Sequence, residues 1–272
     1  MAEATRGNPS DVGRLLRDWR RRRRVSQLEL ALRADSSARH ISFVETGRSR
    51  PSEELVLRLA EHLDVPVRER NALLLAAGYA PRFSRTPLDD PAMGPLRDGL
   101  DRLLRGYEPY PALVVDAVYD VVATNRGLEL LMAPLPEELL ARRPMNAMRL
   151  TLHPHGLAPR IRNLRAWRGH LLAQMERQIA LARSPELRTL YDEVAAYPVP
   201  ERPEGPDCSG SAEPVSYVAL PLVIEHDGHV LSFMSTISTF NTPMDVTVAE
   251  LAVETLLPAD PATAKYLRSA LG

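Results

Sequence analysis

Apolar residues recur at spacings of three and four along the first part of the chain, which is the period of helices that bury one face. Polar or proline-containing stretches interrupt the repeat, so we expect several short helices rather than one long helix. The apolar faces of the five predicted helices are formed by Leu15, Leu16 and Trp19; Leu30 and Ala34; Ile41 and Val44; Leu55, Leu59 and Leu63; and residues 73–76. This pattern predicts a compact helical domain over residues 11–80.

Two of these helices have recognisable ends and are separated by a short polar break. Ser26 and Glu29 have the spacing of a capping box, in which each side chain binds the other's free backbone N–H at a helix start. Residues 35–37 are short and polar, so they favour a turn followed by a new helix cap. Gly47 then ends the second helix. The stretch therefore predicts a helix-turn-helix.

The outward side of the second helix carries groups that can bind base edges. Arginine can bind guanine through two hydrogen bonds, hydroxyls bind either kind of base, and apolar groups contact the thymine methyl. The residues that we assign to this surface are Ser37, Ala38, Arg39, His40, Ser42, Phe43 and Thr46, with Arg48 and Arg50 in the exit loop. We expect Arg39 to read a base and Arg50 to bind phosphate. The alternative is an ordinary pair of helices with exposed side chains.

The remainder of the chain alternates between strand and helix patterns. We predict helices over residues 96–104, 125–132, 157–183, 185–196, 246–256 and 262–271, strands over 112–116, 119–124, 217–225 and 230–239, and a loop over 197–214. The pair Asp227 and Gly228 favours a hairpin between the last two strands. These elements predict an α+β domain with an antiparallel sheet over residues 95–272, joined to the helical domain by a proline-rich linker at 81–94.

Charge is distributed unevenly along the 272 residues. Residues 1–50 hold 12 Arg and 6 acidic residues, a net charge of +6, whereas the whole chain has a net charge of -1 and the rest therefore carries -7. The positive part coincides with the predicted helix-turn-helix, as a DNA-binding domain requires. Five of these arginines are consecutive, at residues 20–24, and we expect one or two of them to bind phosphate.

Over residues 26–52 the chain resembles the Cro/C1-type (XRE) helix-turn-helix family. The matching residues are Ser26, Gln27, Leu30, Ala31, Ile41, Ser42, Val44, Glu45, Gly47, Pro51 and Ser52. The chain departs from the family at Asp35, which replaces the turn glycine, and at Ser36, which replaces an apolar residue. The resemblance implies that the second helix lies in the major groove, that Gln27 touches DNA, and that Glu45 pairs with Arg20.

The two halves together resemble the MmyB-type transcription regulators. The matching phrases are RHISFVETGRSRPS, NALLLAAGYAP, YDVVATN, MRLTLHP, STISTFNTPMDVTVAEL and ETLLPAD. The resemblance covers nearly the whole chain and implies a PAS-like ligand-binding domain over residues 95–272. It also implies a buried apolar pocket there for a fatty-acid-like or other hydrophobic small molecule, with no other cofactor.

Large adaptable side chains in the second half are candidates for lining such a pocket. These candidates are Tyr119, Trp167, Met175, Phe233 and Met234. Plain core packing is the alternative for each of them, because large apolar residues are usually buried. Asn125 follows a predicted strand and is either a polar anchor for the ligand or only a helix cap.

The sequence offers little chemistry for an enzyme. It contains no glycine-rich phosphate loop and no nucleophile elbow, and its lone Cys208 excludes an intrachain disulfide and fits a reducing cytoplasm. His153 and His155 could supply two metal ligands, but a third is not evident nearby, so no metal site is predicted. Asp245 and Glu250 are explained more simply as acidic residues near a helix N-terminus than as a pair of catalytic carboxylates. The absence of a long apolar run predicts no contact with a membrane.

These observations predict a sequence-specific DNA-binding transcription regulator, not an enzyme, in a bacterial cytoplasm. We expect it to bind double-stranded DNA as a homodimer under the control of a hydrophobic small molecule. One alternative is an autoregulator whose second half binds a protein partner, as an antitoxin does. Another is an enzyme with an attached DNA-binding domain.

Overall fold

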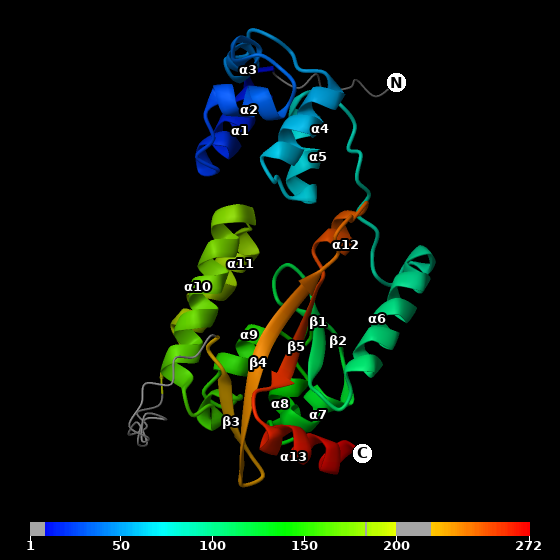
Figure 1. The fold of residues 1–272 in the computed structure, drawn as a ribbon, viewed down its shortest axis with the longest axis vertical. Coiled ribbons are helices and arrows are strands. Elements are labelled where there is room, and N and C mark those ends of the chain that lie inside the picture. Colours follow the sequence, from blue (N-terminus) through cyan, green and yellow to red (C-terminus); the bar gives the residue numbers. More distant parts are fainter. Residues whose placement is uncertain (1–8, 183, 200–218) are drawn as a thin grey trace. The chain divides into compact units, whose positions relative to one another are not determined.

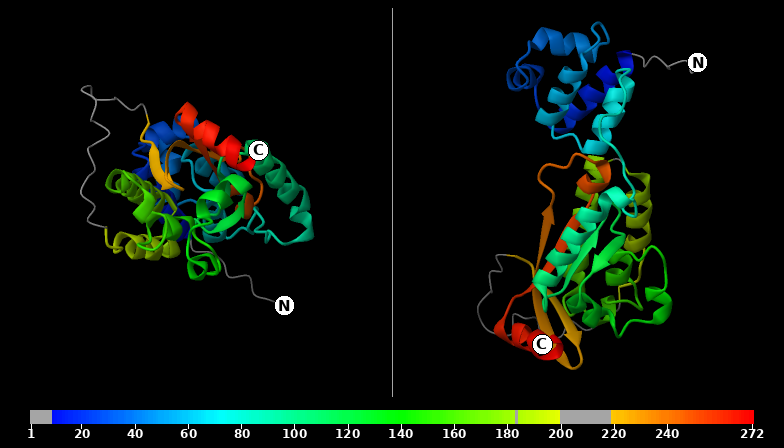
Figure 2. Two further views of the ribbon diagram at one scale, coloured as in Figure 1. Left: turned by 90° about the horizontal axis from the view of Figure 1, so that it is seen from below. Right: turned by 90° about the vertical axis from the view of Figure 1, so that its right-hand side faces the viewer.

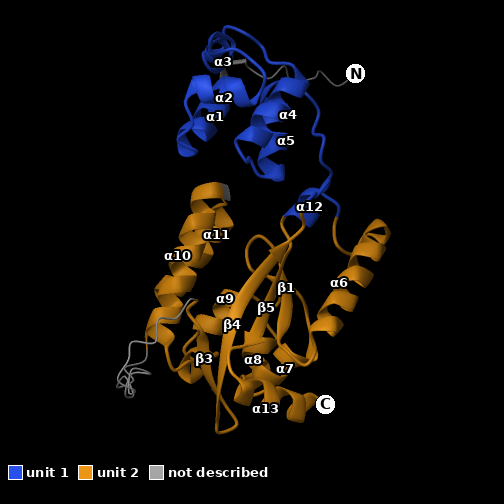
Figure 3. Ribbon diagram, viewed as in Figure 1, with its two compact units in different colours: residues 1–86, 242–249 blue, residues 87–241, 250–272 orange. Residues whose placement is uncertain are grey.

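The chain folds as two compact units, which are coloured separately in Figure 3. The structure is a computed structural model and describes residues 9–182, 184–199 and 219–272. Unit 1 comprises Met1–Thr86 and Thr242–Ala249, and unit 2 comprises Pro87–Asn241 and Glu250–Gly272. The hydrophobic pattern does not indicate that the second segment, residues 242–249, belongs with the helical domain. Cys208 and the start of the strand predicted at 217–225 lie outside the described residues.

Unit 1 contains the five helices that the apolar spacing predicts. They are α1 (Pro9–Arg22), α2 (Gln27–Arg33), α3 (Ala38–Glu45), α4 (Glu53–His62) and α5 (Val67–Ala76), and the second segment adds the short α12 (Val246–Ala249) (Figure 1). Their apolar faces meet in one core, which includes Trp19, Ile41 and Leu59. The five-helix prediction is therefore confirmed.

Local capping fixes where these helices begin. The N-caps of α2, α3 and α4 are Ser26, Ser37 and Ser52, and each serine hydroxyl accepts the backbone N–H three residues ahead. The reciprocal half of the predicted capping box does not form, because the carboxylate of Glu29 accepts a hydrogen bond from Arg33 one turn later. The predicted helix starts are confirmed, but at Ser26 the serine alone supplies the cap.

A left-handed residue shapes the turn between α2 and α3, and a glycine permits the close crossing of α1 over α3. Asp35 has a φ of 47°, so it adopts the left-handed conformation for which the XRE family uses glycine. Gly13 lies where a Cβ would approach the carbonyl oxygen of Val44 to 2.3 Å. Only glycine permits this approach, which brings α1 directly against α3.

Unit 2 is built on one antiparallel five-stranded sheet with strand order β2-β1-β5-β4-β3. The strands are β1 (Ala112–Val115), β2 (Val121–Thr124), β3 (Leu222–His226), β4 (His229–Thr239) and β5 (Ala252–Pro258). The helices of this unit are η1 (Pro91–Met93), α6 (Gly94–Tyr107), α7 (Arg126–Met132), α8 (Glu137–Leu140), α9 (Ala147–Leu152), η2 (Ala158–Arg160), α10 (Leu164–Ala182), α11 (Pro185–Ala195) and α13 (Pro261–Leu271). Both predicted hairpins and the α+β class are confirmed.

The helix predicted over residues 246–256 is wrong. Residues 246–249 form α12, but residues 252–258 form β5, which pairs with both β1 and β4 at the centre of the sheet. Both faces of this strand are covered, so its apolar residues do not alternate cleanly with polar ones. The helix predicted over 157–183 is also too long, because Ile161 bridges to Ile224 and α10 begins only at Leu164.

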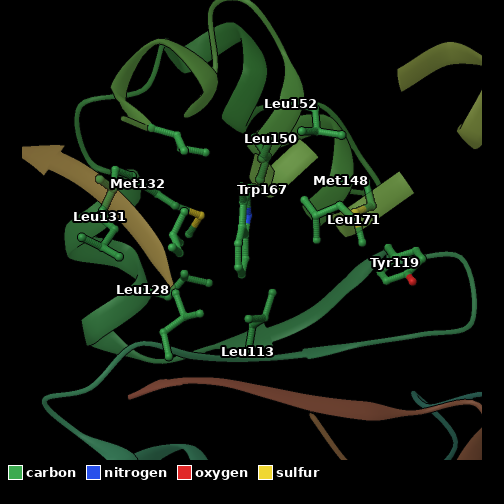
Figure 4. Packing of buried hydrophobic residues seen from close by; sticks show 14 of the residues in the cluster. Leu113, Tyr119, Leu128, Leu131, Met132, Met148, Leu150, Leu152, Trp167 and Leu171 are labelled. Atoms are coloured by element: carbon green, nitrogen blue, oxygen red, sulfur yellow. The ribbon is translucent and has the colours of Figure 1, made fainter. Parts of the chain in front are cut away.

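The two faces of the sheet are covered by different helices. On one face α6 lies along the strands (Figure 2), and Leu100 packs with Val114 and Val253. The opposite face contributes Leu113 and Phe233 to a larger core that α7, α9, α10 and α11 complete. We call this second surface the inner face of the sheet. Figure 4 shows part of its packing, with the indole of Trp167 between Leu113 and the leucines of α9.

Candidate functional site

The exposed side of α3 presents a basic and aromatic surface. Ile41 and Val44 are each 1% exposed, so α3 has one fixed inward face. On the other side Arg39 lies over the ring of Phe43, with its guanidinium carbon 5.2 Å from the ring centre. The guanidinium carbon of Arg48 lies 6.0 Å from the same ring. The two arginines are therefore ordered around one aromatic side chain before any partner binds.

The remaining predicted DNA-contacting residues lie on or beside this surface. Ser37, Thr46, Arg48 and Arg50 are exposed, and Ala38, His40 and Ser42 are half-buried. The hydroxyl of Thr46 donates to the backbone oxygen of Ser42 at 2.8 Å, so it keeps an acceptor position free for a base or phosphate. The contacts of these residues with bases stay a prediction.

A buried carboxylate at the end of α3 fixes this helix to α1 and α2. Glu45 is 4% exposed. Its Oε1 accepts from Nε of Arg20 at 2.6 Å, and its Oε2 accepts from Nη2 of Arg20 at 2.9 Å and from Nε2 of Gln27 at 2.8 Å. Nη2 of Arg17 also donates to the backbone oxygen of Glu45 at 2.8 Å. The pair of Glu45 with Arg20 that the family resemblance implies is thus confirmed.

These contacts determine the charge state of Glu45. Burial alone would raise the pKa of this carboxyl, but hydrogen bonds from Arg20 and Gln27, with the charges of Arg20 and Arg17, lower it below its ordinary value. The carboxylate therefore stabilises the folded state at any pH above its unfolded pKa. This stabilisation is lost as the pH falls through the lowered folded value.

The arginine run at residues 20–24 is engaged largely within unit 1. Besides Arg20, Nε and Nη2 of Arg23 donate to the backbone oxygens of Leu63 and Asp64 at 2.8 and 2.6 Å. The guanidinium of Arg22 lies 5.2 Å from the ring centre of Trp19. Arg21 and Arg24 are exposed, so they are the members of the run most available to phosphate.

Arg50 contacts other residues of unit 1 in a way that the sequence alone does not reveal. Its Nε donates to the backbone oxygen of Ala77 at 3.1 Å, and its guanidinium carbon lies 5.1 Å from the ring centre of Tyr79. The hydroxyl of Tyr79 donates to the backbone oxygen of Pro51 at 3.0 Å. Arg50 therefore braces the loop after α3 against the end of α5.

Four of the five candidate pocket residues meet in the core on the inner face of the sheet. Trp167, Met175 and Phe233 are at most 3% exposed, and Tyr119 is 4% exposed. Met234 differs: it is 42% exposed because it follows Phe233 on β4 and points to the opposite face. Burial raises the pKa of Tyr119 to about 12, and Nε2 of Gln174 lies 3.4 Å from its hydroxyl oxygen.

Asn125 is the N-cap of α7 and uses both ends of its amide within the protein. Its Oδ1 accepts from the backbone N–H groups of Leu128 at 3.1 Å and Ala112 at 2.9 Å. Its Nδ2 donates to the backbone oxygens of Tyr110 at 2.8 Å and Leu104 at 3.2 Å. Of the two roles that the sequence left open, the geometry matches the cap, and it joins α6, β1 and α7.

Sequence reasoning missed a polar junction made by Asp245. Its Oδ2 accepts hydrogen bonds from the hydroxyl of Ser84 at 2.7 Å, and from the hydroxyl and backbone N–H of Thr86 at 2.7 and 3.1 Å. Its Oδ1 caps the following turn by accepting from Thr247 N–H at 2.8 Å. Burial would raise the pKa of Asp245, but these hydrogen bonds lower it. The cap was visible in sequence, but the pairing across 159 residues was not.

The histidines considered as metal ligands belong to another part of unit 2. His153 and His155 lie with ring centres 5.7 Å apart, and the ring of His153 meets that of Tyr197 edge-on. Within the described residues no three His, Cys, Asp or Glu side chains are grouped so that they could hold a metal ion. None of the described helices has the length and apolar character needed to cross a bilayer.

Two family models match the chain. One, a helix-turn-helix domain, matches residues 11–73, and the other, an MmyB-like transcription regulator ligand binding domain, matches residues 96–270. The search of curated proteins gives no match. Among solved structures, the crystal structure of the clp gene regulator ClgR from Corynebacterium glutamicum is 23% identical, with 37% of this chain and 94% of that chain covered and a TM-score of 0.24. An RNA-binding light-oxygen-voltage receptor is 14% identical, with 96% of this chain and 62% of that chain covered and a TM-score of 0.25.

Replacing Glu45 tests whether its carboxylate holds α3 in place. Glu45→Ala leaves the largely buried guanidinium of Arg20 without its carboxylate and with only the backbone oxygen of Val25 as acceptor, so we expect a loss of about 3 kcal/mol. The measurement is the opening free energy of α3 amides by hydrogen exchange. The control is Glu29→Ala, which breaks an ion pair whose side chains are each 47% exposed and should cost about 0.5 kcal/mol or less. Similar losses in both variants would contradict this role.

Replacing Arg50 tests whether it braces the exit loop or binds phosphate. Because its guanidinium contacts Ala77 and Tyr79, Arg50→Ala should lower the melting temperature and leave the salt dependence of DNA binding unchanged. A lost phosphate contact would instead reduce the slope of log K against log salt by about 0.9. That reduction, with an unchanged melting temperature, would restore the phosphate-binding interpretation.

Proposed function

The chain belongs to the MmyB-like transcription regulators, and we propose that it reads a specific DNA site through α3 while a small molecule in unit 2 controls this reading. The observation that carries the DNA-reading half of the proposal is the arrangement of α3. Its inward face is anchored by Ile41, Val44 and Glu45, whereas its outward face carries an arginine ordered on an aromatic ring. A helix fixed in this way can present the same groups to each base pair it meets.

Arg39 and Phe43 have complementary roles in this proposal. The guanidinium of Arg39 can donate two hydrogen bonds to O6 and N7 of guanine, and the ring of Phe43 can contact a neighbouring thymine methyl. Because the two side chains already lie against each other, little side-chain entropy is lost on binding. Gln27 is less available to DNA, because its amide nitrogen already donates a hydrogen bond to Glu45.

We propose that two copies bind together in a bacterial cytoplasm. A single α3 reaches only a few base pairs, and helix-turn-helix proteins commonly pair on half-sites about 34 Å apart to reach useful affinity. The small molecule would act by favouring one of two arrangements of the pair, which requires different affinities for the two arrangements.

Unit 1, which holds α3, is called the reader from here on. The return of the chain into the reader supports control of DNA binding by the sheet of unit 2. β4 and β5 are hydrogen-bonded neighbours in unit 2, and their connection includes residues 242–249 of unit 1. Within unit 1, Asp245 holds this segment to Ser84 and Thr86, and the backbone N–H of Val246 donates to the oxygen of Ser84 at 2.8 Å. The strands β4 and β5 are therefore covalently joined to residues 242–249, so a change in these strands can be passed to a segment that is bound within unit 1.

Replacing Arg39 tests the reading role of α3. Arg39→Ala should relax discrimination at one base position by about 1 to 3 kcal/mol while leaving the other positions unchanged. Selection from a library of randomised duplexes measures this directly. The control is Arg58→Ala, an exposed arginine on α4, which should alter affinity for all sequences alike if it alters affinity at all. Unchanged base preferences in the Arg39 variant would reject the assignment.

Replacing Asp245 tests the link from the sheet to the reader. Asp245→Ala leaves the hydroxyls of Ser84 and Thr86 without their acceptor, so the amides of Thr86 and Val246 should exchange about tenfold faster or more. The control is Asp89→Ala, an exposed residue of the linker. If the link transmits control, the variant keeps its preferred operator but its affinity no longer responds to a copurifying ligand. A full response in the variant would exclude this route.

A further inference from the structure

Residues of α8, α9, α11 and the loop 141–146 line a groove in unit 2. Its volume is about 370 Å³, which lies within the range of sites that bind small molecules. Leu139, Pro144 and Leu150 form the apolar part of its lining, and the rest is polar or charged. The five side chains that the sequence suggested for a hydrophobic pocket do not line it, so this groove is a separate candidate site.

The groove holds more positive than negative charge. Arg142, Arg143 and Arg149 contribute three guanidinium groups, and Glu193 is the only acidic residue among the described residues that line it. Glu193 and Arg149 neutralise each other, because the carboxylate accepts from Nε of Arg149 at 2.9 Å and from its Nη2 at 2.8 Å. Two positive charges therefore remain, whereas residues 51–272 hold 22 basic and 29 acidic residues, a net charge of -7. Such a local excess attracts anions.

Neither of the two remaining arginines has an acidic partner. Nη1 of Arg143 donates to the backbone oxygens of Leu140 and Arg142, which leaves its charge unneutralised. The side chain of Arg142 is exposed and forms no hydrogen bond or ion pair within the described part of the chain. The two neighbouring charges repel each other, and an anion bound beside them would reduce that repulsion.

The groups that the groove leaves open to a ligand are hydrogen-bond donors. Both oxygens of Glu193 are taken, since its Oε1 also accepts from the hydroxyl of Tyr197 at 2.7 Å. Nδ1 of His153 accepts from the backbone N–H of His155 at 3.1 Å, which places the ring proton on Nε2. Burial, with the charges of His155 and Arg142, lowers the pKa of His153, so this ring is a neutral donor at pH 7.

One wall of the groove is fixed to the sheet. Oδ1 of Asn146 accepts from the backbone N–H of Arg149 at 3.2 Å, and its Nδ2 donates to Oδ1 of Asp120 at 2.8 Å. The backbone N–H of Val121 in β2 donates to the oxygen of Met145 at 2.7 Å. The start of α9 is thereby held beside β2 before a ligand binds, which lowers the cost of ordering the site.

From this geometry we propose that the groove binds a small molecule that carries a phosphate monoester. Such a group has a charge between about -1.5 and -2 at pH 7 and three acceptor oxygens, so it can match both unpaired guanidinium groups. A single carboxylate would leave one positive charge unmatched. The apolar part of the lining accommodates the organic part of the molecule. The inference rests on the proposed control by a small molecule and specifies its chemical class.

The test compares three probes on the full chain by calorimetry: phenyl phosphate, benzoate and inorganic phosphate. Phenyl phosphate should bind roughly tenfold to a hundredfold more tightly than benzoate, because it can accept hydrogen bonds from a second charged donor. It should also bind roughly tenfold more tightly than inorganic phosphate, because its ring contacts the apolar side chains of the groove.

Two variants locate the binding site. Arg142→Ala removes the guanidinium that has no partner, so it should weaken the binding of phenyl phosphate about tenfold or more and leave the melting temperature unchanged. The control is Arg102→Ala, which removes an exposed arginine of α6 outside the groove. This variant should bind phenyl phosphate as the unmodified chain does.

Several results would overturn the proposal. They are no binding of phenyl phosphate, no advantage of it over benzoate or over inorganic phosphate, and unchanged binding in Arg142→Ala. A salt slope of DNA binding reduced by about 0.9 in Arg142→Ala would also overturn it, because the groove would then contact the DNA backbone. Failure of the proposed function has a different signature. If phenyl phosphate binds through Arg142 but DNA affinity stays constant, the site exists and the control by a ligand does not.

Discussion

The buried carboxylate of Glu45 is the constraint on which the DNA-reading unit depends. A charge removed from water must be paired, and the groups that pair it come from α1 and from the start of α2. One side chain thereby sets the position of three helices. The exposed surface of α3 can be polar because its placement is set on its buried side, by the packing of Ile41 and Val44 and by the contacts of Glu45.

Much of this arrangement depends on interactions between residues close in sequence, and the sequence therefore predicts it. The serine caps, the apolar spacing of α1 to α5 and the hairpin at Asp227 involve residues within a few positions of each other, and all were predictable. The misassigned β5 shows the limit of periodicity, because a strand covered on both faces has no alternating pattern. Met234 shows a related limit. Its adaptable apolar side chain suggested that it lines the ligand pocket, whereas its position on β4 directs it to the opposite face of the sheet.

Long-range contacts account for the other differences. Arg50 contacts backbone oxygens that no short-range pattern brings near it, and Asp245 binds residues more than a hundred positions earlier. Such hydrogen bonds depend on how distant segments pack together. The sequence therefore indicates only one partner of each, an arginine that looks exposed or an acidic residue that looks like a helix cap. The resemblance to a family supplied the pairing of Glu45 with Arg20 because that contact is part of the shared fold.

The reader is discontinuous in sequence, and this has a consequence for biosynthesis. Residues 1–86 leave the ribosome while the return segment, residues 242–249, is still untranslated. The helices α1 to α5 can fold early as a unit, yet Ser84 and Thr86 wait for Asp245 until residues 87–241 of unit 2 have been made. A nascent polypeptide that ends before residue 242 therefore lacks this last piece, so a finished unit 1 signifies that β1 to β4 of the sheet have also been synthesised.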